Sequence, residues 1–507
     1  MTLPELGVGL VYFQVLAPLV EERGAVDLLE VEPQVFWLPS DGPDRYRDGG
    51  APLRWLAGLP VSKIAHGVGS PIGSAAPPAV ESIDRFARDI ETLGASWASE
   101  HLSFNRARGE SGPFEAGFLL PPRQTRQAAL RIARNVRSFA ARLPVPFAIE
   151  TGVNYLKPLP GELSDGSFVA TVAEEADCGI LLDLHNVWTN ERNGRQPVEA
   201  FLHEIPLERV VEVHLAGGEW FQGYWLDAHS GPVQEELLSI ARRVLPELPE
   251  LRALVFEILA DRVPKVGFET IREQIAVLRR LWDARLTIRS RSRRRTRRRT
   301  QPASTAAQPA AIGSEPDDAS QWEDALASLV VGRCATGKFA ADLAFDPGIP
   351  IFRELVESQR AGAAVDALKL TTRLLRLSLG SEGLMAELRA FWASKAPSLF
   401  GADEGAALGA FLAERQIPVP HFAEVLAFER ALLRIHRGSS GEVVHFSCDP
   451  AALLGALAEH RLPAKLPAAE LQLHLSPDGT ILALRQPKSR IRKTFELRGS
   501  TMSEAEP

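Results

Sequence analysis

Short apolar runs alternate with longer amphipathic stretches over the first 286 residues of the chain. The short runs are rich in Val, Ile, Leu and Ala, which is typical of buried strands, while apolar residues recurring every three or four positions predict helices. We predict strands near 7–12, 27–32, 62–67, 96–102, 145–150, 179–184, 210–215 and 253–258. We predict helices at 82–94, 123–142, 196–204, 234–245 and 267–282. Strands that alternate with helices indicate a parallel sheet, and eight such units in about 280 residues predict a closed (β/α)8 TIM barrel.

Polar side chains follow the predicted strands at the points where they end. The run from Leu181 to Trp188, for example, is apolar until it reaches Asp183, His185 and Asn186. All strands of a parallel barrel end on one face, and active sites form there. A doubly wound open sheet is less favoured, because it collects its site at a single switch point. The histidines and acids expected on this face are His66, His101, Glu150, Asp183, His214, Asp227, His229 and Glu257.

Imidazole and carboxylate groups together are ligands for divalent iron, zinc or manganese. Each of these residues alone is more often a helix cap or a loop hydrogen-bond partner, but their coincidence favours a metal centre. Eight ligands exceed the needs of one ion, so we predict two or three ions that share carboxylates and keep open positions for chemistry. Asn154, Asn186 and Glu212 are expected to orient ligands or to contact substrate. His185 is a further candidate for the catalytic set, with its role left open.

Composition and charge narrow the class of protein. With 45% hydrophobic and 24% charged residues, the 507-residue chain fits a soluble globular protein of two or three domains. The net charge of -7 gives no reason to expect nucleic acid as a partner. Three widely spaced cysteines suggest neither a disulfide framework nor a metal motif, so we expect a reducing cytoplasm. We expect no export signal and no membrane partner, because no apolar run approaches the roughly 18 residues of a spanning helix.

An arginine-rich block at 289–299 interrupts the barrel pattern and leads into a segment rich in Pro, Ala, Ser and acidic residues. This composition predicts a disordered linker over 287–320. Such a block can bind polyanions through phosphate charge alone, but a solvated tether is the simpler interpretation. The domain organisation that we predict is therefore a barrel at 1–286, a linker at 287–320 and a third region at 321–507.

The third region is predicted to be mainly helical, with a small sheet at its end. The segments 442–446, 471–475 and 480–485 read as strands, and Asp478-Gly479 predicts a hairpin turn between the last two. We predict helices at 322–331, 351–360, 365–379, 384–393, 404–414 and 422–435. The histidines here are dispersed along the chain, so we expect them to have surface or structural roles rather than to bind metal. They are His421, His436, His445, His460 and His474.

Six ordered motifs within about residues 5–283 resemble those of the multinuclear non-haem iron-dependent oxidative enzymes, a family that includes the oxidase of methanobactin biosynthesis. The motifs are His66-Gly67-Val68-Gly69-Ser70-Pro71-Ile72-Gly73, Ser99-Glu100-His101-Leu102-Ser103, Glu150-Thr151-Gly152-Val153-Asn154-Tyr155, Leu182-Asp183-Leu184-His185-Asn186-Val187, Val213-His214-Leu215-Ala216-Gly217 and Asp227-Ala228-His229-Ser230-Gly231-Pro232-Val233. The resemblance implies a TIM barrel with two or three irons that uses dioxygen to modify a residue, commonly cysteine, in a ribosomally made precursor peptide.

The resemblance also implies how the ligands are shared. His66, His101 and Glu150 would hold one iron, with Glu150 bridging to the next. Asp183, His214 and Glu257 would surround a second iron, and Asp227 and His229 a third. Where the family commonly has an Asn pair after the aspartate of the fourth motif, this chain has His185 and then Asn186.

Enzymes of this family usually act with a small protein that recognises the precursor's leader. Region 321–507 is similar to such partners in its order of elements, which is helical first and β-rich last. This similarity implies a fusion of enzyme and recognition module. Two other functions fit the residues alone. One is a divalent-metal isomerase or phosphodiesterase built on the same barrel, and the other is a nucleic-acid-binding regulatory protein that uses the arginine block. The sequence leaves a homodimer open.

Overall fold

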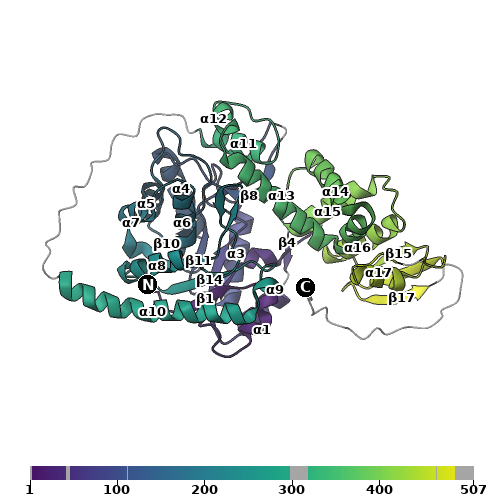
Figure 1. Cartoon of the computed structure of the whole chain (residues 1–507), viewed down its shortest axis with the longest axis horizontal. Helices are drawn as coiled ribbons and strands as arrows, with labels where there is room; N and C mark the ends of the chain where they lie inside the picture. Colours follow the sequence, from purple (N-terminus) through teal and green to yellow (C-terminus); the bar gives the residue numbers. More distant parts are fainter. Residues whose placement is uncertain are drawn as a thin grey trace.

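A closed parallel barrel forms the N-terminal half of the protein (Figure 1). The computed structural model describes residues 3–40, 46–48, 50–110, 112–296, 318–398, 400–463 and 465–485. Around the barrel the strand order is β1, β14, β11, β10, β9, β6, β5 and β2. The strands are β1 (Gly7–Val11), β2 (Leu28–Val31), β5 (Ser62–Gly67), β6 (Ala98–His101), β9 (Phe147–Glu150), β10 (Gly179–Asp183), β11 (Val210–Ala216) and β14 (Ala253–Glu257). The prediction of a (β/α)8 barrel is confirmed, and each predicted strand overlaps one of these eight.

Helices cover the outside of the barrel and bury their apolar faces on the strands. In α3, for instance, Ile83, Phe86 and Ile90 are buried at helical spacing, and the helix ends at Gly94, whose φ of 63° is left-handed. The helices of this half are α1 (Ala17–Val20), α2 (Ala51–Gly58), α3 (Val80–Leu93), α4 (Arg126–Ala140), α5 (Asp165–Ala176), α6 (Leu184–Arg192), α7 (Val198–Glu204), α8 (Glu235–Val244), α9 (Val263–Val266) and α10 (Phe268–Thr296).

Three antiparallel hairpins, which the sequence pattern did not predict, extend from the loops that follow barrel strands. They are β3–β4 (Trp37–Pro39 with Tyr46–Asp48), β7–β8 (Phe104–Ala107 with Phe114–Leu120) and β12–β13 (Glu219–Phe221 with Tyr224–Leu226). Each lies between a strand and the next helix along the chain, so the hairpins build up the face where the barrel strands end.

The first helices after the arginine block pack directly on this face. Trp322 and Leu326 of α11 (Ala319–Val330) and Phe352 of α13 (Gly348–Ala367) share one apolar cluster with Phe104 and Tyr155 of the barrel half. The short α12 (Ala340–Ala344) belongs to the same cluster through Leu343. The barrel and these helices therefore have a common core.

The remaining elements form a second apolar cluster, reached through the far end of α13 (Figure 1). Ala364 of α13 packs within this cluster, and Arg360 forms a buried ion pair of 2.5 Å with Glu404. The elements are α14 (Lys369–Ser394), α15 (Gly401–Ala413), α16 (Phe422–His436), α17 (Pro450–Ala458) and an antiparallel sheet of β15 (Glu442–Phe446), β16 (Leu471–Leu475) and β17 (Ile481–Arg485). The α13 helix thus connects the two clusters as one continuous element.

The predicted linker at 287–320 is described only at its two ends. Helix α10 continues to Thr296, and α11 begins at Ala319. Residues 297–317, which include part of the arginine block, lie outside the described residues. None of the helices in the described ranges has the length and apolar character needed to cross a membrane.

Candidate metal centre

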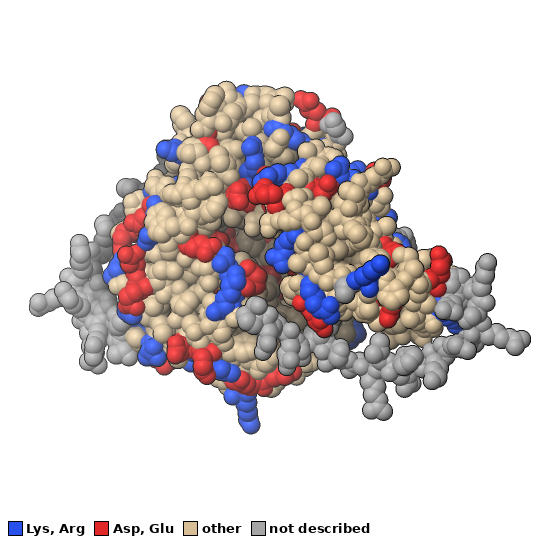
Figure 2. Space-filling model, turned by 45° about the vertical axis from the view of Figure 1, so that its right-hand side comes forward, with Lys and Arg blue, Asp and Glu red and all other residues tan. Residues whose placement is uncertain are grey.

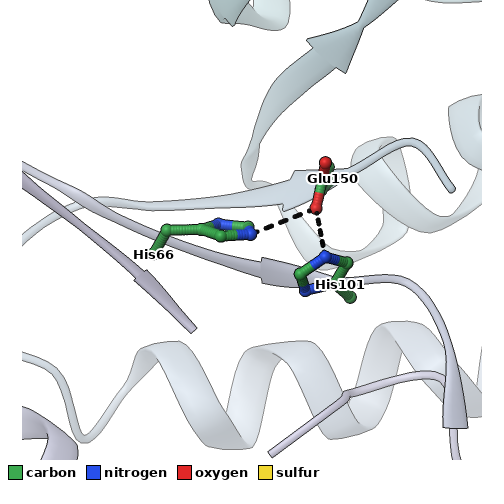
Figure 3. Close-up of side chains that lie close together, drawn as sticks. All are labelled: His66, His101 and Glu150. Atoms are coloured by element: carbon green, nitrogen blue, oxygen red, sulfur yellow. Dashed lines mark ion pairs between the residues drawn. The ribbon is translucent and has the colours of Figure 1, made fainter. Parts of the chain in front are cut away.

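The eight predicted ligands lie together at the ends of the barrel strands. Figure 3 shows the first group, in which one carboxylate oxygen of Glu150 faces the imidazoles of His66 and His101. Glu150 Oε2 lies 3.3 Å from His66 Nε2 and 2.9 Å from His101 Nε2. Metal bonds of about 2.1 Å at right angles place neighbouring ligand atoms about 3.0 Å apart. The spacing of these three donor atoms therefore suits a shared cation, and we term the group position 1.

Two further groups continue from Glu150. In position 2, Glu150, Asp183 and His214 have donor atoms within 4.8 Å of one another, and the same holds in position 3 for Asp183, His229 and Glu257. Glu150 thus belongs to positions 1 and 2, and Asp183 to positions 2 and 3. This is the arrangement expected of carboxylates that bridge neighbouring ions.

Glu257, which belongs to position 3, also lies close to His214 of position 2. Its Oε1 is 3.2 Å from His214 Nδ1, while its Oε2 is 3.3 Å from His229 Nε2. Asp227 Oδ1 is 2.8 Å from His229 Nε2 and 3.6 Å from His185 Nε2. Asp227 and His185 therefore lie beside position 3.

Several donor atoms in this centre are buried without a hydrogen bond from any described residue. They are Glu150 Oε2, Asp183 Oδ2, His214 Nδ1, Asp227 Oδ1, His229 Nε2 and Glu257 Oε2. A buried polar atom without a partner costs free energy, and cations bound at positions 1 to 3 would satisfy these atoms. The donor set also contains no thiolate, which suits a harder divalent ion better than a structural zinc site. The residues present fit a multinuclear metal centre.

The ionisation of these groups is mutually dependent. Burial acts to lower the pKa of His229, but the carboxylates of Asp227 and Glu257 raise it to about 10. Burial acts to raise the pKa of Glu257, but His214 and His229 lower it to about 2. Burial and the neighbouring carboxylates raise the pKa of Asp183 well above its usual range. Without cations, protons on the imidazoles therefore balance part of the carboxylate charge.

A layer of polar contacts orients the ligands. His66 Nδ1 lies 2.7 Å from Ser99 Oγ, and His101 Nδ1 lies 2.9 Å from the carbonyl oxygen of Gly67. A Cβ at position 67 would lie 2.4 Å from the carboxylate of Glu100, so any larger residue at this strand end would displace that acid. Because each second ring nitrogen is engaged, the Nε2 atoms are held toward Glu150.

Two buried acids contact the second ring nitrogen of His214. Its Nε2 lies 2.9 Å from Glu30 Oε2 and 3.4 Å from Glu212 Oε1, and Trp97 Nε1 donates to Glu212 Oε2 at 2.8 Å. Burial and the nearby Glu212 raise the pKa of Glu30 to about 8, although His214 opposes the shift. The predicted orienting role fits the position of Glu212, which contacts a ligand without lying in positions 1 to 3.

The three residues predicted to be catalytic occupy different surroundings. Asn154 Oδ1 accepts the Leu156 N–H at 3.0 Å, so its side chain shapes the loop after β9. Asn186 donates from Nδ2 to the Thr151 carbonyl at 3.3 Å, while its Oδ1 is buried without a hydrogen bond from a described residue. His185 is fully buried, and this burial lowers its pKa to about 4.

Glu30 and Glu32 were missed as members of this centre. They end the second strand, so the rule that selected the other ligands would have found them. The charge of Glu32 interacts with those of His66, Glu257 and His101, and burial raises its pKa.

Tyr155 was not predicted to take part in the site either, because it does not end a predicted strand. Its hydroxyl accepts the Asp227 N–H at 3.0 Å, which fixes the loop that bears Asp227 and His229. A tyrosine in a loop gives no periodic signal, so only the folded arrangement identifies this contact.

Comparison with known proteins places residues 5–272 within a family model described as "RiPP precursor modification enzyme MbnB/TglH/ChrH", where RiPP denotes a ribosomally synthesised and post-translationally modified peptide. A UPF0276 protein of Streptomyces avermitilis is 34% identical over 244 residues, which are 47% of this chain and 48% of that protein. The chain thus spans about half the length of this relative. A UPF0276 protein of Chromobacterium violaceum is 30% identical over 223 residues, 43% of this chain and 78% of that protein.

Solved structures with the same general fold are more distant. Endonuclease IV from Thermus thermophilus aligns with a TM-score of 0.37 at 15% identity, covering 55% of this chain and 99% of the other. Likeness at this level carries no information on activity.

Proposed function

Because this chain belongs to the family of RiPP precursor modification enzymes MbnB/TglH/ChrH, we propose that it is an iron- and dioxygen-dependent oxidase of a precursor peptide. The residue that it modifies is cysteine in this proposal, and the reaction takes place in the cytoplasm. The barrel holds two or three irons, and the helical and β-rich region 321–507 binds the leader of the precursor.

The observation that carries the iron proposal is the sharing of carboxylates along positions 1 to 3. Four acids, Glu150, Asp183, Asp227 and Glu257, supply the negative charge that two divalent ions neutralise. Imidazole and carboxylate ligands without thiolate are the set found in oxygen-activating non-haem iron centres. A centre with three protein donors at a position retains room for substrate or dioxygen.

Bound iron would supply the electrons and the affinity for dioxygen and thiolate that the side chains lack. The chain's own residues then position the substrate. His185 is uncharged at neutral pH, because burial lowers its pKa to about 4, and it lies beside Asp227. It can therefore contact the substrate without adding charge to the centre. Asn186 Oδ1 can accept a hydrogen bond from an amide of the bound peptide.

A groove between the two halves offers the peptide a route to this centre. Figure 2 shows the surface hollowed between the barrel and the C-terminal helices. A groove of about 480 Å³ is lined by Glu32 and Gly69 of the barrel and by Gln359 and Phe400 of the C-terminal region. Glu32, which lines this groove, also interacts through its charge with His66, His101 and Glu257, which supports a route for the precursor from this groove toward the centre. Fusion would raise the effective concentration of this region for the barrel to about the millimolar range, less for a long linker.

The first test is elemental analysis of anaerobically purified protein for iron, zinc and manganese, with absorption spectra before and after exposure to air. Two or three irons per chain and an oxygen-dependent spectral change support the proposal. Zinc or manganese alone, without a response to oxygen, would overturn it in favour of non-redox metal chemistry.

The peptide substrate is tested by co-expression with cysteine-containing short peptides encoded next to the gene, followed by mass spectrometry. A mass change confined to a cysteine-containing fragment, and lost when that cysteine is replaced by serine, supports the assignment. Modification that persists in the serine variant would overturn the choice of cysteine.

A further inference from the structure

A second cluster of potential ligands lies in the C-terminal region, far along the chain from the barrel ligands. His421 precedes α16, Glu424 lies in its first turn, and Cys448 follows β15. The donor atoms of these three residues lie within 4.8 Å of one another. The expectation of surface or structural roles for the histidines of this region stays a prediction, but the surroundings of His421 suggest another role. The folded chain brings it to an acid and a thiol that the sequence pattern did not connect.

The distances within this cluster lie close to those around one tetrahedral ion, so small shifts of the side chains would complete the geometry. Cys448 Sγ lies 3.7 Å from His421 Nδ1 and 3.9 Å from Glu424 Oε2, and these last two atoms are 3.1 Å apart. Zinc bonds of about 2.3 Å to sulfur and about 2.0–2.2 Å to nitrogen or oxygen place tetrahedral ligand atoms roughly 3.4–3.6 Å apart. We propose that His421, Glu424 and Cys448 form a zinc-binding site that is separate from the barrel centre.

The three side chains are held in this arrangement by the surrounding backbone. Glu424 Oε1 accepts the Ser447 N–H at 3.0 Å and also the Ser447 hydroxyl, which leaves Oε2 turned toward the other two donors. His421 has a φ of 62°, a left-handed conformation that is uncommon outside glycine and that often marks functional positions. The cost of this conformation is offset if a cation binds the imidazole.

Exposure distinguishes the three ligands and indicates where a fourth would bind. Cys448 is 1% exposed, whereas the side chains of His421 and Glu424 are 25% and 19% exposed. A groove lined by His421, Glu424, Leu426 and Arg430 opens next to them. The fourth position of the ion is therefore on the solvent side, where water can occupy it.

The chemistry of the donors selects the class of ion. A thiolate combined with an imidazole favours zinc over magnesium or calcium. Burial is the main reason that the pKa of Cys448 is raised to about 11, so without a cation the thiol keeps its proton at neutral pH. An ion that binds here must displace this proton, as in other zinc–thiolate sites. Magnesium and calcium, which prefer oxygen ligands, are not expected to do so.

The site would join two parts of the C-terminal region. His421 and Glu424 belong to the start of α16, and Cys448 connects β15 to α17. An ion held by all three ties the helices to the small sheet independently of the apolar cluster between them. This role does not depend on the barrel's activity, so the proposal stands or falls separately from the proposed oxidase function.

Cobalt(II) titration of the full-length protein tests the site, because a thiolate ligand gives cobalt(II) a charge-transfer absorption in the near ultraviolet that oxygen and nitrogen ligands do not. The barrel centre has no thiolate among its predicted ligands, so cobalt bound there does not give this absorption. We expect cobalt added beyond the amount that fills the barrel centre to produce the band, and an excess of zinc to remove it.

Two variants and a matched control complete the experiment. Cys448→Ser should abolish the band, and Cys334→Ser, which changes an exposed cysteine, should leave it unchanged. His421→Asn should weaken cobalt binding at least tenfold without disturbing the fold, since asparagine tolerates the left-handed conformation. Circular dichroism confirms that each variant is folded. Absence of the band in the wild-type protein, its persistence in Cys448→Ser, or unchanged affinity in His421→Asn would each overturn the proposal.

Discussion

Glu150 is the residue whose replacement tests the metal centre most directly, because its two oxygens face different groups. Oε2 faces His66 and His101 at 3.3 and 2.9 Å, and Oε1 lies 3.7 Å from His214 Nδ1. Glu150→Gln keeps the size of the side chain but removes its charge and turns one oxygen into an amide donor. We expect this variant to lose metal at positions 1 and 2 together.

The magnitude follows from the number of ligands. Four-ligand zinc sites bind with about 10–16 kcal/mol, so one ligand contributes on average about 2.5–4 kcal/mol, equivalent to a factor of roughly 10²–10³ in dissociation constant. Glu150 belongs to two positions, so the loss applies to both ions. Glu212 touches only a ligand, His214, and removal of such an orienting group weakens metal binding by about 10–100-fold.

The assay is an anaerobic ferrous titration of wild-type protein, Glu150→Gln and Glu212→Gln, with iron counted after desalting. We expect Glu150→Gln to retain at least one iron fewer per chain and to lose its activity on peptide, while Glu212→Gln retains its iron at saturating concentration. Full iron content in Glu150→Gln, or equal losses in the two variants, would show that Glu150 is not a shared ligand.

Three further predictions concern the contacts of α11 with the barrel half and the loop that carries Asp227. Trp322→Ala should lower the free energy of unfolding by about 3–5 kcal/mol, because Trp322 of α11 is buried against the barrel half; an unchanged urea midpoint would contradict this. Burial raises the pKa of Glu323 from 4.5 to about 7, so the wild-type protein should lose about 3 kcal/mol of stability as pH rises from 4.5 to 7, because the unfolded state releases the proton first. Glu323→Gln should remove this dependence, as seen in denaturation midpoints at pH 5 and pH 8, and an equal slope in both proteins would refute the assignment. Tyr155→Phe removes the acceptor of the Asp227 N–H and should weaken the last iron by roughly the 1 kcal/mol of one hydrogen bond, whereas an unaltered iron titration would exclude this positioning role.

The barrel was predictable because its signal is local. An apolar run such as that of β10, ending at Asp183, specifies both a buried strand and the face on which its last side chain lies. Eight repetitions of this pattern specify the closed sheet. The same rule predicts that Glu30, near the end of β2, lies next to the ligands, and its carboxylate does contact His214.

The contacts between distant segments were not predictable in this way. Trp322 donates a hydrogen bond to the Pro121 carbonyl at 3.1 Å across a separation of 201 residues, and no periodic pattern links the two. Cys448 and His421 are 27 residues apart and meet only because β15 packs beside α16. Hairpins such as β7–β8 were missed for a related reason, since their short strands are stabilised by α11 and α13 rather than by their own sequence.

The connection through Tyr155 bears on how leader recognition can be tested. Tyr155 packs against Phe352 of α13, with ring centroids 5.2 Å apart, and its hydroxyl holds the backbone of Asp227. A chain ending near residue 286 would lose Phe352 and expose the apolar cluster that Tyr155 shares with α11 and α13. Loss of activity in such a truncation would therefore report a disturbed metal centre as readily as a missing leader site. Variants confined to the second apolar cluster, beyond α13, separate leader recognition from support of the metal centre. In such variants the iron content should stay normal, while the rate of modification of a peptide with its leader should fall to the rate for a peptide without one.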